Sequence, residues 1–254
     1  MTEADYLKNY RLSNYIQTSI ATDIACFSVS ELKENNYRKL SHKKLSILLI
    51  KRGEHPYKGK WALPGGFLQG TETLEKAAIR ELREETGIEK AYMEQLYSFS
   101  SLDRDPRARI ISVAYLALLN KRTLLRVTTD ATEAKWFEVS YKKLSKHTKK
   151  LILRSEVEEV EAKDMAFDHA DIIILALERL RGKVEYTPIA LNLLPKQFTL
   201  SSLQQVYEAI LDRPLIAANF RRKMKGLVIE TENYAENGGH RPSKLYKRRE
   251  DEDE

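Results

Sequence analysis

The stretch over residues 66–88, GFLQGTETLEKAAIRELREETGI, joins a glycine-containing loop to a charged amphipathic segment. The helical spacing of its apolar residues predicts a helix over residues 73–85, and these residues are Leu74, Ala77, Ala78 and Leu82. Either Thr71 or Thr73 can cap the start of this helix, and Gly87 suits its end. The sequence therefore predicts a loop that leads directly into a capped helix.

Three carboxylates of this helix, Glu81, Glu84 and Glu85, cluster on one face and repel one another, which lowers helix stability. A hard cation such as Mg²⁺ or Mn²⁺ removes the repulsion because it prefers carboxylate oxygens. The alternative is a solvated charged face, where Glu and Arg are common at such spacings. The Pro-Gly-Gly run at residues 64–66 and the fixed spacing favour the metal site.

Neighbouring residues complete the pattern. Arg80 lies on the adjoining face and can steady the carboxylates by ion pairing, while Gly65 and Gly66 let the backbone approach a metal or a phosphate. From Gly66 through Glu72 to residues 80–88, the spacing resembles the signature of the Nudix family of MutT-like hydrolases at every fixed position. By element order, the resemblance covers roughly residues 15–180.

This resemblance implies roles for the residues of the box. The metal ligands that it implies are Glu81, Glu84, Glu85 and the carbonyl of Gly65. The catalytic residues that it implies are Glu84, Glu85, Arg80 and Glu72, with Glu72 supporting the metal cluster. The reaction would be attack of a metal-activated water on a diphosphate linkage, with Mg²⁺ or Mn²⁺ lowering the pKa of that water.

The segment at residues 99–115, FSSLDRDPRARIISVAY, resembles the segment after the box in Nudix domains that recognise ADP-ribose. Its arginines, Arg104, Arg107 and Arg109, suit paired contacts with phosphates, and each is equally compatible with an ordinary surface position. Together with Gly66, they are the predicted substrate-binding residues.

Two pairs of residues near the box have open roles. Asp130 or Glu133 lies where some members of the family place a catalytic acid, and either also suits a turn. Trp61 and Phe67 flank the glycine loop, where each can pack in the core or stack on a base.

Apolar runs with polar ends predict the strands around the box, and they cover residues 19–28, 45–51, 94–101, 110–119 and 134–139. A second amphipathic helix is predicted over residues 166–182. Helices and strands that alternate in this way indicate an α+β Nudix fold, with one mixed sheet between helices.

Composition excludes several classes of protein. Cys26 is the single cysteine and lies in an apolar run, which excludes an internal disulfide and a cysteine-rich zinc site and suits a core position. The N-terminal run MTEADYLKNYRLSNY lacks a signal-peptide core, and no apolar run is long enough to span a bilayer. We therefore expect a soluble cytoplasmic protein without a membrane partner.

Positive charge concentrates in the C-terminal part. Between Lys196 and Arg249 there are eleven basic and five acidic residues, an excess that equals the formal net charge of +6 of the whole chain. An all-acidic tail follows at residues 250–254. The excess favours a polyanionic partner, although a solvated basic face has the same composition.

The pattern of the chain changes near Tyr186. Residues 186–199 hold two prolines and no clear period, so they are predicted to form a tether. The elements predicted after it are helices over residues 200–211 and 215–225 and strands over residues 227–231 and 245–248. Ser201 and Gln204 have capping-box spacing at the start of the first of these helices. Helices followed by a hairpin are typical of a small winged helix.

The run from Leu193 to Met224, with the later RPSKLY, resembles the winged-helix domain of Nudix-related transcriptional regulators of NAD metabolism. Those regulators couple an ADP-ribose-sensing Nudix domain to DNA binding. The resemblance implies that double-stranded DNA is contacted from the recognition helix and the wing. The residues placed there are Asn219, Arg221, Arg222, Lys223, Lys225 and, in the wing, His240 and Arg241.

The sequence thus predicts a Nudix domain over residues 1–185, a winged helix-turn-helix domain over residues 186–249 and an acidic tail, in a homodimer. The first functional hypothesis is a DNA-binding regulator of NAD metabolism that binds ADP-ribose or a related nucleoside diphosphate derivative. The alternative is a Nudix hydrolase, similar to ADP-ribose pyrophosphatase, whose C-terminal domain serves dimerisation or RNA binding. The basic run at residues 221–225 supports the first and the intact glutamates support the second, so enzymatic activity stays open.

Overall fold

The computed structural model describes residues 2–10, 16–31, 43–122, 131–145, 148–235 and 242–249. Its main sheet is mixed and has the strand order β5-β6-β1-β2-β7-β8-β9, with β3 paired to β2 and β4 paired to β1. The strands are β1 (Ser19–Glu31), β2 (Lys43–Arg52), β3 (Trp61–Ala62), β4 (Gly65–Phe67), β5 (Tyr92–Phe99), β6 (Ile110–Leu119), β7 (Ala131–Lys143), β8 (Lys149–Arg154) and β9 (Glu159–Glu161). Strand β1 runs parallel to β6, and the other pairings are antiparallel.

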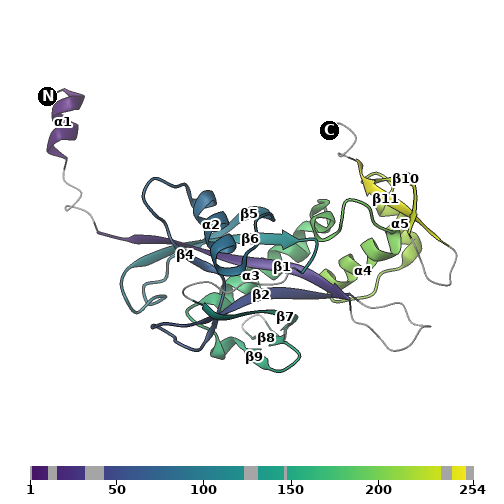
Figure 1. Ribbon diagram of the computed structural model, residues 1–254, viewed down its shortest axis with the longest axis horizontal. Helices are drawn as coiled ribbons and strands as arrows, with labels where there is room; N and C mark the ends of the chain where they lie inside the picture. Colours follow the sequence, from purple (N-terminus) through teal and green to yellow (C-terminus); the bar gives the residue numbers. More distant parts are fainter. Residues whose placement is uncertain are drawn as a thin grey trace.

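Helices cover both faces of this sheet (Figure 1). Helix α2 (Leu74–Thr86) packs its buried Ala78 and Leu82 on one face, against Ile24, Cys26 and Leu48. Helix α3 (His169–Lys183) follows the one-turn helix η2 (Ala162–Asp164) and packs on the other face. The predicted mixed sheet between helices is confirmed. Cys26 is fully buried, and burial raises the pKa of its thiol.

Local sequence signals place α2 where they predict it. The Thr73 side chain accepts a hydrogen bond from the Lys76 backbone N–H at 3.3 Å, so Thr73 rather than Thr71 is the cap. Gly87 ends the helix with φ 74°, a left-handed conformation that glycine adopts without steric cost. Strands β1 and β7 extend beyond their predicted ranges, and the short β8 and β9 were not predicted.

The C-terminal part is a winged helix (Figure 1). It contains η3 (Ile189–Leu193), α4 (Leu200–Leu211), α5 (Ala217–Met224) and the hairpin β10 (Val228–Ala235) with β11 (Ser243–Arg248). Phe198 and Tyr246 exchange backbone hydrogen bonds of 3.0 and 2.8 Å, which ties the wing to the segment before α4. The Thr199 side chain, rather than the predicted capping box at Ser201 and Gln204, accepts from the Ser202 N–H at 3.0 Å.

The predicted tether over residues 186–199 is wrong. Ile189, Leu191, Leu193 and Phe198 are each at most 6% exposed and belong to the same hydrophobic cluster as α3, α4 and the sheet. A short 3-10 helix in which four of five residues are buried has neither the period of an amphipathic helix nor that of a strand, so the sequence pattern did not predict it. One hydrophobic core therefore runs from the sheet into the winged helix.

Helix α1 (Glu3–Asn9) stands at the end of the molecule opposite the winged helix (Figure 1). Its Thr2 cap forms a capping box with Asp5, and this helix was not predicted although the sequence contains the signal for its start. Among the described residues, no helix combines the length and the apolar character needed to cross a membrane.

Candidate functional site

The glycine loop touches two of the box glutamates. The Gly65 backbone N–H donates to the carboxylate of Glu85 at 2.8 Å, and Glu85 is only 9% exposed. A Cβ atom on Gly66 would lie 2.3 Å from an oxygen of Glu81, and one on Gly65 would lie 2.1 Å from the Thr22 carbonyl oxygen. The backbone contact leaves room only for glycine at position 65, and a side chain at position 66 would require the Glu81 carboxylate to move. The loop and α2 are therefore in direct contact.

Arg80 is the hub of the box. Its guanidinium contacts Glu72 at 2.7 Å, Glu81 at 2.6 Å and Glu84 at 3.3 Å, and it donates to the Phe67 carbonyl at 3.2 Å. Burial raises the pKa of Glu81, and the charges of Glu84 and Glu72 add to this, although Arg80 opposes it. The predicted steadying of the carboxylates by Arg80 is therefore present in the structure.

The carboxylates of the box fit a divalent cation in kind. Carboxylate and carbonyl oxygens are the ligands that Mg²⁺ takes in proteins. Within the described ranges, however, no three His, Cys, Asp or Glu side chains converge as a metal-binding group. The reason is visible in the contacts: Arg80 draws Glu81 and Glu84 toward itself, while Glu85 turns to the Gly65 N–H.

A cavity of about 180 Å³ opens beside the glycine loop. The box contributes Gly65, Gly66, Phe67 and Glu85 to its lining, and β1 contributes Ala21 and Asp23. The rest of the wall comes from other parts of the chain, including Arg52, His55, Arg104, Arg107, Phe167 and His169. The cavity thus gathers residues from the box, the sheet and the start of α3.

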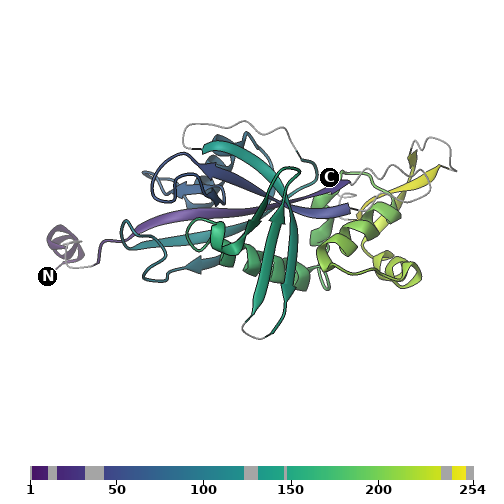
Figure 2. The same cartoon turned by 90° about the horizontal axis from the view of Figure 1, so that it is seen from below.

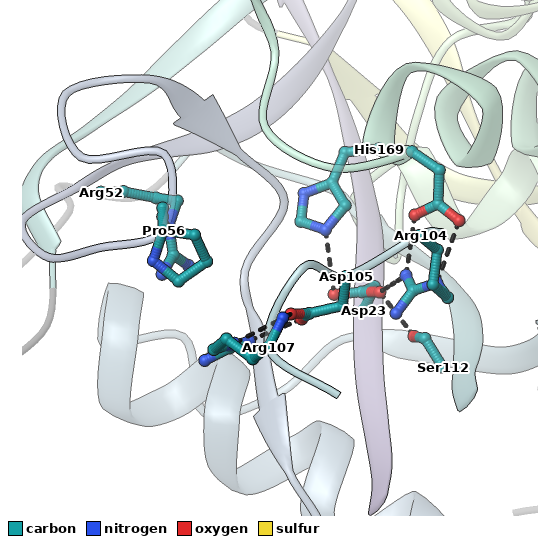
Figure 3. A network of polar contacts seen from close by, with 9 residues as sticks. Asp23, Arg52, Pro56, Arg104, Asp105, Arg107, Ser112 and His169 are labelled. Carbon is teal, nitrogen blue, oxygen red and sulfur yellow. Dashed lines mark hydrogen bonds and ion pairs between the residues drawn. The ribbon is translucent and has the colours of Figure 1, made fainter. Parts of the chain in front are cut away.

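A buried carboxylate, Asp23, organises one wall of this cavity (Figure 3). Arg104 donates to it at 3.1 Å, His169 Nε2 lies 3.3 Å from it, and the Ser112 hydroxyl donates to it. Burial alone would raise the pKa of Asp23, but His169, Arg104 and Ser112 together lower it to about 2. Arg104 also contacts Asp168 at 2.7 Å, so one guanidinium joins two carboxylates.

The start of α3 enters the cavity through residues that were not predicted as site residues. Phe167 has φ 51°, a left-handed conformation that is strained for a non-glycine residue. His169 is 4% exposed, and its Nδ1 accepts from the Leu63 backbone N–H at 2.8 Å. Arg52 places its guanidinium 5.0 Å from the Phe167 ring. The available signal in the sequence was Asp23, the one charged residue of the predicted strand over residues 19–28, because a buried charge needs partners.

The three predicted phosphate-binding arginines separate in the structure. Arg107 lines the cavity, pairs with Asp105 at 2.7 Å and lies 5.1 Å over the Phe67 ring. Arg104 also lines it but is 7% exposed and committed to its two carboxylates. Arg109 instead donates to the carbonyls of Ser100 and Ser101, away from the cavity lining.

The structure decides some of the roles that the sequence left undecided near the box. Trp61 is 4% exposed and packs edge-on to Phe137, with ring centres 4.8 Å apart, so it is a core residue. Phe67 is 38% exposed in the cavity. Glu133 pairs with Lys135 at 2.5 Å and with Lys51 at 3.7 Å, outside the cavity lining. Asp130 lies outside the described residues.

Helix α5 presents a basic surface. Phe220 and Met224 are buried, which leaves Asn219, Arg221 and Arg222 exposed on its other sides, with Lys225 just after it. Lys223 differs because its Nζ donates to the Val184 carbonyl at 3.3 Å and lies 5.6 Å from the Tyr207 ring. It thereby links α5 to the end of α3. His240 and Arg241 fall outside the described residues.

Comparison with known families accounts for both halves. A model described as the NUDIX domain matches residues 39–169, and one described as the NrtR DNA-binding winged helix domain matches residues 190–247. A curated protein of Acinetobacter baylyi, named "ADPR responsive transcriptional repressor NtrR", is 34% identical over 97% of this chain and 88% of its own length. The chain belongs to the NrtR family.

Solved structures agree with this assignment to the NrtR family. A crystal structure of a MutT/nudix family protein from Enterococcus faecalis is 32% identical, with a TM-score of 0.77, and the match covers 98% of this chain and 94% of that one. Shewanella oneidensis NrtR, crystallised with a 27mer DNA, is 27% identical with a TM-score of 0.64, over 91% and 94% of the two chains.

The Asp23 network predicts a pH-dependent contribution to stability. A carboxyl whose pKa falls from about 3.9 in the unfolded chain to about 2 in the folded one stabilises the fold above about pH 4, and this contribution is lost as pH falls toward 2. We expect Asp23→Asn to lower the free energy of unfolding at pH 7 by about 2–3 kcal/mol. Urea titrations should show that the difference in free energy of unfolding between wild type and Asp23→Asn becomes smaller below pH 4. Asp103→Asn, at an exposed position, is the matched control. A difference in free energy of unfolding that stays constant down to pH 2.5 would contradict the lowered pKa of Asp23.

Proposed function

We propose that this NrtR-family chain is a transcriptional repressor of NAD metabolism that binds ADP-ribose at the cavity beside the box and DNA through its winged helix. The observation that carries the proposal is helix α3, which begins in the cavity and ends against the winged helix. The relative in Acinetobacter baylyi is named as ADPR-responsive, and the Shewanella oneidensis protein was crystallised with DNA.

The cavity suits a nucleoside diphosphate. Glycine at positions 65 and 66 brings the backbone close to a bound diphosphate, and Arg107 and Arg52 supply positive charge beside it. The centres of the Phe67 and Phe167 rings lie 5.1 and 5.7 Å from the Arg107 guanidinium, and these rings offer stacking surfaces for a base. These features support ADP-ribose or a close derivative as the ligand.

Helix α3 runs from the sheet toward the helices of the winged helix (Figure 2). Its 15 residues span about 22 Å at the usual helical rise. At its far end, the Arg181 side chain donates to the Ile210 carbonyl in α4 at 2.8 Å, and the Val184 carbonyl accepts from Lys223 of α5. A ligand that displaces the start of α3 would therefore move α4 and α5 relative to the sheet.

The exposed face of α5 suits the major groove of duplex DNA. Arginine and asparagine at Asn219, Arg221 and Arg222 are the side-chain types that read base edges, and Lys225 suits a phosphate. In a homodimer, two such helices would contact the two half-sites of one DNA site. Lys223 is the weaker candidate for DNA because it already contacts Val184.

We expect Arg221→Gln with Arg222→Gln to weaken binding to the DNA upstream of the chain's own gene by roughly 1–3 kcal/mol per lost base contact. Fluorescence anisotropy titrations at several salt concentrations measure this, since phosphate contacts add to the salt dependence. The control is Arg213→Gln, an exposed arginine in the turn before α5. Equal losses on specific and random duplexes would mean that these residues contact phosphates alone.

ADP-ribose should change DNA affinity by about 5- to 150-fold, the range of typical coupling energies. The titrations should use the Glu84→Gln variant, which should bind ADP-ribose without cleaving it. Glu84 is chosen because it is exposed, whereas Glu85 accepts the hydrogen bond that holds the glycine loop. In that background, Arg181→Gln should reduce the coupling and keep both separate affinities, whereas the exposed Arg179→Gln on the same helix should keep the coupling. Identical DNA dissociation constants with and without ADP-ribose would refute the sensor function.

Hydrolysis is a second candidate, favoured by the intact glutamates on α2. When bound, Mg²⁺ would supply an activated water and neutralise phosphate charge. Glu84→Gln and Glu85→Gln should each lower Mg²⁺-dependent cleavage of ADP-ribose by orders of magnitude, while Glu89→Gln, beyond the helix, should not. Chromatography of the nucleotide products measures this. If the wild-type protein binds ADP-ribose and leaves it intact, the hydrolase function is excluded and the sensor function is retained.

A further inference from the structure

A second cavity, of about 550 Å³, lies on the far side of the sheet from the nucleotide cavity. Ser30 of β1 lines it, seven residues beyond Asp23, which is about 23 Å along an extended strand. Because strand side chains alternate, Ser30 and Asp23 face opposite sides of the sheet. The two cavities share no lining residue, so this cavity belongs to neither proposed function.

Unsatisfied hydrogen-bonding groups concentrate at this cavity. Among the described residues, five buried side-chain nitrogen or oxygen atoms have no hydrogen-bond partner. Three of them belong to its lining residues, namely Ser30 Oγ, Arg122 Nε and Trp136 Nε1. Buried polar groups are nearly always paired, since leaving one unpaired costs free energy. Their gathering in one wall therefore indicates a missing partner.

The chemistry of these groups limits what that partner can be. The indole N–H of Trp136 and the Nε–H of Arg122 can only donate, so the partner must carry acceptors. The Arg122 guanidinium also donates to the Ser46 hydroxyl and lies 6.0 Å from the centre of the Trp136 ring. It forms no ion pair among the described residues, although its charge is partly buried.

The charges around Arg122 also favour a partner that carries acceptors. Burial lowers the pKa of its guanidinium, and the charges of Glu138 and Glu156 raise it only in part. Both glutamates line the cavity, where they can accept hydrogen bonds from hydroxyl groups. Cavities of this volume are typical of small-molecule sites.

We propose that this cavity binds a small oxyanion, a molecule bearing a phosphate or a carboxylate, with its charged group on Arg122 and the indole N–H of Trp136. A charge-assisted hydrogen bond to the guanidinium would satisfy Arg122 and neutralise its charge. Hydroxyl groups elsewhere in the ligand would face Glu138 and Glu156.

Trp136 makes the site directly observable, because the chain has only two tryptophans and the other, Trp61, lies in the core. Inorganic phosphate and benzoate, added separately to the full chain, should distinguish a phosphate site from a carboxylate site through a saturable change in tryptophan fluorescence. Sodium chloride at equal ionic strength controls for screening. The signal should vanish in Trp136→Phe, and calorimetry should still detect binding in that variant with reduced affinity.

Arg122→Gln should raise the half-saturation concentration about tenfold or more, while Lys121→Gln, an exposed neighbour outside the lining, should leave it unchanged. Saturating ADP-ribose should not compete with either probe. Equal half-saturation in wild type and Arg122→Gln would overturn the proposal, as would a response to sodium chloride alone. A change of oligomeric mass in Arg122→Gln, without binding of either anion to wild type, would make the cavity an interface between copies and overturn it as well.

Discussion

The paired charge of Asp23 holds together the elements on which both proposed functions depend. Its carboxylate is only 7% exposed in β1, and an unpaired charge at such a position would be very unfavourable. Arg104 comes to it from the loop before β6, and His169 comes from the first residue of α3. Asp168 completes the set from the opposite side of Arg104. Strand, loop and helix are therefore fixed by one network rather than by apolar packing alone.

That network also determines where a ligand can act. A buried pair is strongly destabilised when one partner is displaced, so α3 has few intermediate positions near its start. At its other end, α3 contacts α4 and α5 within one continuous core, so that a displacement of α3 would be passed to these helices. Coupling still requires that the ligand prefer one arrangement of the two parts, since it can shift an equilibrium only by that preference. A rigid connection makes such a preference effective at a distance, which a flexible tether would not.

Local features were predictable from the sequence because their causes are local. The box fixes a loop, a Thr73 cap and a Gly87 end within a few residues, and strand β6 was predicted with its observed bounds. The winged helix was also predictable, because α4 and the hairpin each show a local pattern of apolar residues. The errors arose where distant segments decide the outcome. Residues 186–199 have the composition of a linker, but their apolar side chains fill a core formed by α3 and α4.

The site residues show the same limit. Arg104, Arg107 and Arg109 look equivalent in sequence, yet their partners are Asp23, Asp105 and backbone carbonyls. The role of His169 depends on Leu63, which is 106 positions away. Asp105 lies two positions from Arg107, but Asp23 is 81 positions from Arg104, so only the first pairing has a local signal in the sequence.

The box itself explains why intact glutamates do not decide between sensing and cleavage. Glu85 accepts from the Gly65 N–H and so shapes the loop that lines the nucleotide cavity, whether or not a metal is present. Glu81 packs against Gly66, and a side chain at position 66 would displace its carboxylate. Arg80 pairs with Glu72, Glu81 and Glu84 and offsets part of their negative charge without a cation. A divalent ion must compete with this guanidinium, whereas ADP-ribose binding needs only the loop that Glu81 and Glu85 hold in place. Under the proposed function, these glutamates would first shape the binding site, and hydrolysis would require in addition that they bind a metal.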